Sequence, residues 1–132
     1  VHIDYYDVWS MDHTLAVIIL PMLKMLKEKK QGSPFVDDED VPEHIRSTAA
    51  PSKEHEWDID DFFHQRWEWV MNEMIYAFTM ISNDDDWEHD VLISGTKDEV
   101  SQKIMWGKHK EIQDRISNGF RLFGKYYQGL WD

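Results

Sequence analysis

The sequence predicts a mainly α domain: a three-helix, bundle-like fold with a long ordered loop after the first helix. Two observations predict it. Apolar residues recur at spacings of three and four in three separate segments, and three of the four prolines stand between the first and second of these. With 132 residues, of which 42% are hydrophobic, the chain can form a modest core as one domain, residues 1–132.

The first segment contains an alternating start and then a helix. Residues 1–6 alternate apolar and polar side chains, which is typical of a short strand. A helix follows, capped by Asp7 or Ser10. Its apolar stripe consists of Val8, Met11, Leu15, Ile18, Met22 and Met25. Because residues 15–20 are apolar on all sides, we expect this helix to be central, with a kink at Pro21.

Residues 32–57 are predicted to form a long loop, because three prolines punctuate them. Apolar side chains can anchor it to the bundle: Phe35, Val36, Val41, Ile45 and Trp57. Asp40 followed by Pro42 indicates one short helical turn. Long loops in compact domains are usually functional or disordered, and the five anchors favour an ordered, functional loop.

A second helix is expected over Asp58–Ile81, and a third from Thr96 to the C-terminus, opened by the capping-box pattern Thr96-Lys-Asp-Glu99. The apolar stripe of the second helix consists of Phe63, Trp67, Val70, Met74, Phe78 and Ile81. That of the third consists of Met105, His109, Ile112, Ile116, Phe120, Phe123, Tyr127 and Leu130. In the acidic connection at 82–98, a minor short strand pair is an option at Trp87, Val91 and Ile93.

The net charge of −12 excludes general nucleic-acid binding, which needs a basic face to displace counterions. Fifteen of the 26 carboxylates lie in the segments Asp37–Glu43, Glu54–Asp61 and Asp84–Asp90. Such segments are typical of solvated connections and helix caps; the alternatives are a cation site or a surface that imitates DNA. No apolar run approaches the about 20 residues of a membrane span, so no membrane partner is expected.

A cationic and aromatic surface is the leading candidate for ligand binding. Residues 118–132, NGFRLFGKYYQGLWD, combine aromatic rings with Arg and Lys, and the long loop adds further donors. The candidate ligand-binding residues are Arg46, Ser47, Thr48, Arg115, Arg121, Lys125, Tyr126 and Trp131. Cationic groups bind phosphates and aromatic faces stack on bases, so a small anionic ligand such as a nucleotide fits this set. The alternative is that the rings form core and the cations pair with the many acids.

Metal-ligating and catalytic residues do not form a specific motif. The metal candidates are Glu73, His109 and Asp12. Glu73 lies at the edge of an apolar stripe, where a carboxylate needs an ion-pair partner, a metal or a role as general base. Glu111-Ile-Gln-Asp114 is similar to one ExxD pair of the all-α nucleotide pyrophosphohydrolases, but Glu68 and Glu73 do not supply the facing ExxE. No nucleophile elbow, P-loop or GxGxxG is present, so neither a catalytic residue nor a cofactor is assigned.

Three segments together resemble a group of short hypothetical proteins of tailed bacteriophages: DVWSMDHTLAVIILPMLKMLK, GSPFVDDEDVPEHIRST and NGFRLFGKYYQGLWD. The signature patterns are WSMD…ILPMLK, VDDEDVP and RLFGKYY…LWD, and the 82–98 connection is shorter here than in those relatives. The resemblance implies a viral gene product acting in the cytoplasm of an infected bacterial host. It assigns no catalytic residues.

The sequence therefore favours a non-enzymatic phage accessory protein that binds and sequesters a small anionic ligand, such as a host defence signalling nucleotide. Two alternatives remain open: an acidic decoy or inhibitor that binds a host protein, and a metal-dependent nucleotide hydrolase on an all-α scaffold. Met- and aromatic-rich helices with an apolar C-terminus predict a homo-oligomer. The absence of cysteine fits a reducing cytosol.

Overall fold

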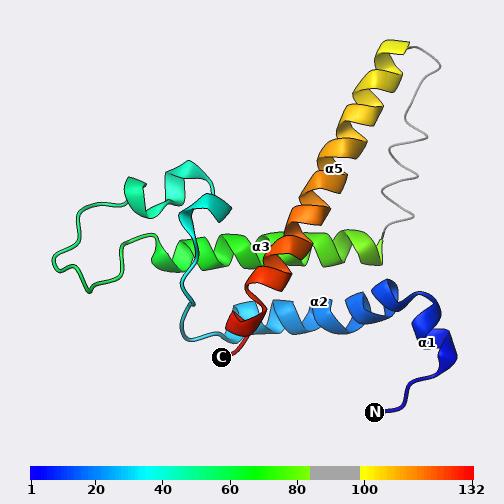
Figure 1. The fold of residues 1–132 in the computed structure, drawn as a ribbon, viewed down its shortest axis with the longest axis horizontal. Helices are drawn as coiled ribbons and strands as arrows, with labels where there is room; N and C mark the ends of the chain where they lie inside the picture. The colour runs from blue at the N-terminus through cyan, green and yellow to red at the C-terminus, as the bar shows by residue number, and fades with distance from the viewer. Residues whose placement is uncertain (84–98) are drawn as a thin grey trace.

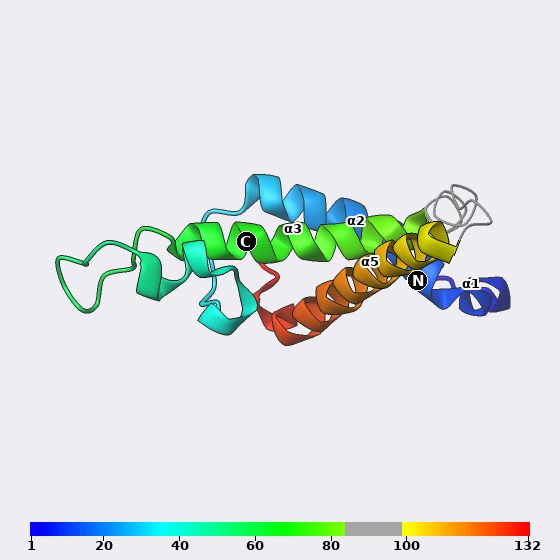
Figure 2. The ribbon, with the colours of Figure 1, turned by 90° about the horizontal axis from the view of Figure 1, so that it is seen from above.

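The computed structural model describes residues 1–83 and 99–132, except for the side chains of residues 99–102. The mainly α fold is confirmed, and no strand occurs among the described residues. The helices are α1 (Tyr5–Trp9), α2 (Met11–Lys29), α3 (Phe63–Ser82) and α5 (Glu99–Lys125). α2 and α3 lie side by side in opposite directions, and α5 crosses α3 at a steep angle (Figures 1 and 2). None of the described helices combines the length and apolar character that crossing a membrane requires.

α3 is the central helix, because it packs against both α2 and α5. Its buried residues are Arg66, Trp67, Val70, Met71, Glu73, Met74, Ala77 and Phe78. The helix begins at Phe63 rather than at Asp58. Asp60 lies before the helix, where its carboxylate accepts the backbone N–H of Phe62 at 2.9 Å. All six residues predicted for its apolar stripe are buried or half-buried.

The prediction that the first long helix is central is wrong. Only Ala16 and Leu23 of α2 are buried, and they face the core that α3 dominates. The predicted stripe is exposed instead, as Ile18 at 53% and Met22 at 65% show. The helix is apolar on more than one side, and α3 covers only one of them. α2 runs through Pro21 without interruption.

The strand predicted for residues 1–6 is also wrong, because α1 begins at Tyr5 and Ser10 separates it from α2. The Asp7 carboxylate accepts the backbone N–H of Asp4 at 2.9 Å, a contact that supports the first turn of a helix. α1 has no buried residue.

The long loop contains three short 3-10 helices: η1 (Asp38–Asp40), η2 (Glu43–Ile45) and η3 (Ser47–Ala49). η1 and η2 each have one buried residue, and η3 has none. η2 follows Pro42 and confirms the predicted turn. Of the predicted anchors, Val36, Val41 and Ile45 are buried. Phe35 and Trp57 are 71% and 80% exposed, contrary to prediction. Trp57 lies in the second half of the loop, and Figures 1 and 2 show that this half projects away from the helices.

α5 ends at Lys125 rather than at the C-terminus, and η4 (Tyr127–Gly129) follows it. Ile116, Leu122 and Tyr126 are buried in this region, whereas Phe120 and Tyr127 of the predicted stripe are exposed. The strand option in the 82–98 connection and the cap at Thr96 lie outside the described residues.

Gly119 sets the crossing of α5 over α3. A Cβ atom added at Gly119 would lie 2.6 Å from the Ala77 Cβ and 2.6 Å from the Glu73 carbonyl oxygen. The backbone of α5 therefore approaches α3 more closely than any side chain would permit. The side of α5 that carries Gly119 therefore faces α3.

Candidate functional site

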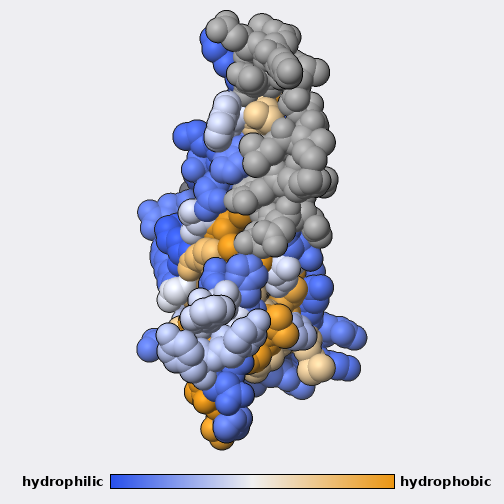
Figure 3. All heavy atoms as spheres, turned by 90° about the vertical axis from the view of Figure 1, so that its right-hand side faces the viewer, coloured by the Kyte–Doolittle hydropathy of each residue, from blue (hydrophilic) through white to orange (hydrophobic). Residues whose placement is uncertain are grey.

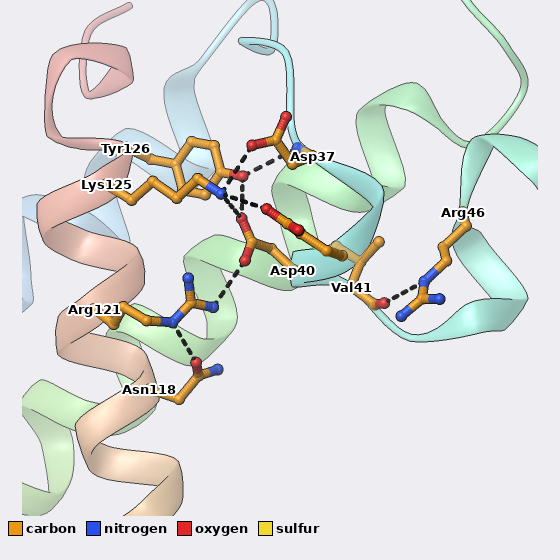
Figure 4. A network of polar contacts seen from close by, with 9 residues as sticks. Asp37, Asp40, Val41, Arg46, Asn118, Arg121, Lys125 and Tyr126 are labelled. Atoms are coloured by element: carbon orange, nitrogen blue, oxygen red, sulfur yellow. Dashed lines mark hydrogen bonds and ion pairs between the residues drawn. The ribbon is translucent and has the colours of Figure 1, made fainter.

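A buried carboxylate, Asp40, joins the long loop to the C-terminal end of α5 (Figure 4). Its side chain is 3% exposed. It accepts hydrogen bonds from Tyr126 Oη at 2.5 Å, Lys125 Nζ at 2.6 Å and Arg121 Nη2 at 2.8 Å. The Tyr126 hydroxyl in turn accepts the backbone N–H of Asp37 at 3.0 Å. Asp40 thus has a full set of partners, as a buried charge requires.

The partners of Asp40 determine its charge. Burial by itself raises the pKa of Asp40, but the hydrogen bonds from Lys125, Tyr126 and Arg121 outweigh it and hold this pKa below the ordinary value. Burial, together with the hydrogen bond to Asp40, raises the pKa of Tyr126 to about 12. Hydrogen bonds to Asp37 and Asp40 raise the pKa of Lys125. At neutral pH Asp40 is therefore a carboxylate that faces two cations, Lys125 and Arg121, and the neutral phenol of Tyr126.

The described part of the chain brings one group of acids close enough to hold a cation: Asp37, Glu39 and Asp40. The Lys125 ammonium lies among them, at 2.8, 3.4 and 2.6 Å from their respective oxygens. The lysine therefore occupies the position that a metal ion would take. The metal candidates that the sequence suggested, Glu73, His109 and Asp12, do not belong to this group.

Glu73 has an ion-pair partner across the helix crossing. Arg115 donates to Glu73 Oε2 from Nε at 3.0 Å and from Nη2 at 2.7 Å. Glu73 is 8% exposed, and the Arg115 guanidinium lies 3.7 Å from the centre of the Tyr76 ring. This geometry suits a structural ion pair between α3 and α5.

Arg66 of α3 binds the long loop at Ile45 and binds Asp60, which lies just after the loop. It donates to Asp60 Oδ1 at 2.9 Å and Oδ2 at 2.6 Å, and to the Ile45 carbonyl at 3.2 Å. Hydrogen bonding from Arg66 lowers the pKa of Asp60 despite partial burial. Among the described residues, the one buried side-chain polar atom without a hydrogen-bond partner is Nε of this arginine.

The candidate ligand-binding residues of the loop lie apart from those of α5. Arg46 donates from Nε to the Val41 carbonyl at 3.0 Å, and Figure 4 shows its side chain away from Arg121 and Lys125. The Ser47 hydroxyl is bound to Asp38. Thr48 is exposed.

The three cationic candidates on α5 all have ion-pair partners, whereas the two aromatic candidates after it differ in exposure. Arg115, Arg121 and Lys125 are all paired with carboxylates, and the Arg121 Nε also donates to Asn118 at 2.9 Å. Tyr126 is buried, and Trp131 is 73% exposed. An anion at this site would have to compete with carboxylates that are already bound to the cations.

Sequence reasoning assigned no partner to Asp37 or Asp40. Both lie in a run of acids, which is typical of solvated loops. The available signal was the apolar Val36 and Val41 on either side of the run. Both are buried in the structure and fix this segment against the bundle.

A second surface is formed by residues 54–61, which we call the acidic–aromatic loop. It alternates carboxylates with two exposed apolar side chains, Trp57 at 80% and Ile59 at 54%. The Trp57 ring stacks on His55, with centroids 4.5 Å apart and planes at 4°. An exposed tryptophan among charges is suited to binding a protein surface.

Comparisons of this chain with protein-family models, curated proteins and solved structures found no match.

Proposed function

We propose that this chain is a non-enzymatic protein-binding protein that docks on a basic surface of its partner through the acidic–aromatic loop. The observation that carries the proposal is the exposure of Trp57 and Ile59, at 80% and 54%, within a run of carboxylates. Tryptophan is enriched in the residues that dominate interface energies. The surrounding carboxylates would steer a basic partner and accelerate association.

Hydrogen bonds that already hold the loop support this proposal, because binding a partner would then order few additional groups. Its base is held by the bidentate pair between Asp60 and Arg66. Within it, the backbone N–H of His55 donates to the Asp58 carboxylate at 3.2 Å. Lys53, which precedes the loop, donates to the Glu56 carbonyl at 3.1 Å. A loop arranged in advance loses less conformational entropy on binding.

The resemblance to phage proteins would make the partner a protein of the bacterial host. A host DNA-binding protein is the concrete version, because such proteins present a basic surface to an acidic ligand. The chain would then act as an acidic decoy.

Affinity capture tests the proposal. The chain is immobilised, bacterial lysate is passed over it, and retained proteins are identified by mass spectrometry. We expect a basic protein that is released by moderate salt and is lost with Trp57→Ala. Trp106→Ala is the matched control, because Trp106 is also exposed, at 59%, but lies on α5. Retention that survives Trp57→Ala, or no retained protein at all, would contradict the proposal.

Binding of a small anionic ligand is a second candidate. Its support is that Arg115 and Arg121 keep half of their side-chain surface exposed, at 50% and 49%. Titration calorimetry against cyclic and linear nucleotides tests it, with Arg121→Ala as the site variant. Heat of binding that disappears in this variant would favour this candidate over a protein partner.

A further inference from the structure

α2 carries an apolar stripe that no other described residues bury. We call it the α2 seam: Met11, Leu15, Ile18, Met22 and Met25. Its members follow each other at alternating spacings of four and three, which is the repeat of a coiled-coil seam. All five are exposed, from 38% for Leu15 to 65% for Met22 and Met25. The residues that face the core, Ala16 and Leu23, lie on another side of the helix.

Two hollows flank the seam. One, of about 580 Å³, lies between α2 and the C-terminal segment and is lined only by uncharged side chains, including Leu15, Phe123 and Leu130. The other, of about 430 Å³, lies between α1 and α2 and includes Val8 and again Leu15. Because Leu15 lines both, the hollows adjoin along the seam. Figure 3 shows hydrophobic side chains on the surface at the α1 end of the molecule.

α1 continues this apolar surface. Its Tyr5, Tyr6 and Trp9 are exposed to 80%, 78% and 75%. A helix of five residues has no stability of its own in water, and monomeric proteins rarely expose a contiguous apolar patch of this kind. α1 and the α2 seam together therefore form a surface suited to burial.

The charges at the two ends of α2 point to the occupant. No Asp, Glu, Lys or Arg lies between His13 and Leu23, although the net charge is −12. Asp4, Asp7 and Asp12 lie at or before the N-terminal end, whereas the exposed Lys24 and Lys29 outnumber one exposed acid, Glu28, toward the C-terminal end. Two antiparallel copies of α2 bring the acidic end of each beside the basic end of the other, whereas parallel copies place like charges together. The surface thus complements itself, as a two-fold interface requires.

We propose that the α2 seam is a homodimer interface, in which α2 packs antiparallel against α2 of a second copy. Ile18 is the middle residue of the seam, so it lies near the two-fold axis, and Met11 of one copy faces Met25 of the other. The proposal does not rest on the acidic–aromatic loop, which projects beyond the C-terminal end of α2 (Figure 1).

Sedimentation velocity of the full chain tests the interface. We expect a dimer of twice 15.9 kDa for the native sequence. Ile18→Glu places two carboxylates at the axis and should give a monomer with unchanged circular dichroism. Val17→Glu is the matched control, because Val17 is 69% exposed but lies off the seam, so this variant should stay dimeric. A monomeric native chain, or equal dissociation of both variants, overturns the proposal.

Cysteine cross-linking tests the orientation and does not depend on how Ile18→Glu folds. The chain contains no cysteine, so each introduced thiol reports a single position. Under mild oxidation, the cysteine of Ile18→Cys should form a disulfide with the same cysteine of the second copy. Met11→Cys should form a disulfide only when it is mixed with Met25→Cys. Efficient self-linking of Met11→Cys overturns the antiparallel arrangement, and the absence of all these disulfides overturns the interface.

Discussion

Tyr126 donates a hydrogen bond of 2.5 Å to Asp40, and this bond joins the end of α5 to a turn 86 residues earlier in the chain. Lys125 and Arg121 bind the same carboxylate, so the long loop is tied to α5 at one buried point. The stability of the fold should therefore depend on the carboxylate of Asp40 and the phenol of Tyr126.

Replacing Asp40 with asparagine should lower the free energy of unfolding by about 2 kcal/mol, because two cations lose a buried anionic partner and the amide cannot accept all their hydrogen bonds. Urea denaturation measures the change. The matched control is Glu39→Gln, since Glu39 also contacts Lys125 but is 77% exposed. Its effect should stay within about 0.5 kcal/mol. Equal effects of the two variants would contradict the role assigned to Asp40.

The phenol of Tyr126 should ionise later than an ordinary tyrosine, because its pKa is raised to about 12 from an ordinary value of about 10. A raised pKa means that Tyr126 contributes stability below pH about 10 and that this contribution is lost as the pH rises toward about 12. Ultraviolet titration should show a late phase that belongs to Tyr126. The phase should be missing from Tyr126→Phe and present in Tyr127→Phe.

The crossing of α5 over α3 should not tolerate a side chain at Gly119. Gly119→Ala should destabilise the protein by about 2 kcal/mol or more, because the new Cβ would meet backbone at 2.6 Å. Gly107→Ala, in the same helix but with nothing within 4 Å, should stabilise it by about 0.5–1 kcal/mol through helix propensity. Thermal melting of both variants measures this difference, and a stabilised Gly119→Ala would refute the close approach.

Acid should weaken the fold through the aspartates whose pKa is depressed. Hydrogen bonding from Arg66 lowers the pKa of Asp60, so its contribution to stability is fully present above the unfolded value of about 3.9 and is lost as the pH falls through the lower folded value. The difference in stability between the native chain and Asp60→Asn should therefore narrow below pH about 4. Urea denaturation across this pH range measures the difference in the free energy of unfolding. A difference that stays constant with pH would show that Asp60 does not contribute to the loss of stability in acid.

Local pattern located the three long helices, but it missed α1 and did not show which elements pack against each other. The apolar spacing around Trp67 and Val70 located α3 and its buried side, because a helix of that period has one stripe to bury. Pro42 correctly marked the turn η2. The expectation for Trp57 failed because an apolar side chain in a loop does not reveal whether the loop returns to the bundle.

The candidate site was predictable in composition and not in arrangement. Arg121, Lys125 and Tyr126 were recognisable as cations beside a ring, but their common partner Asp40 is more than 80 residues away in the chain. Arg46, which the sequence placed in the same set, is turned to the Val41 carbonyl. Sequence spacing carries no information about contacts of that range.

By itself, the sequence determined that three segments form helices and which of their faces are apolar, because both properties follow from the local period of the side chains. Only the tertiary structure decided which apolar face is covered. The side of α5 with Gly119 faces α3, and at the end of this helix Tyr126 is buried and Tyr127 is exposed. α3 covers one side of α2, while the side with Ile18 stays open. A helix can present two apolar sides, and its partners determine which one becomes core.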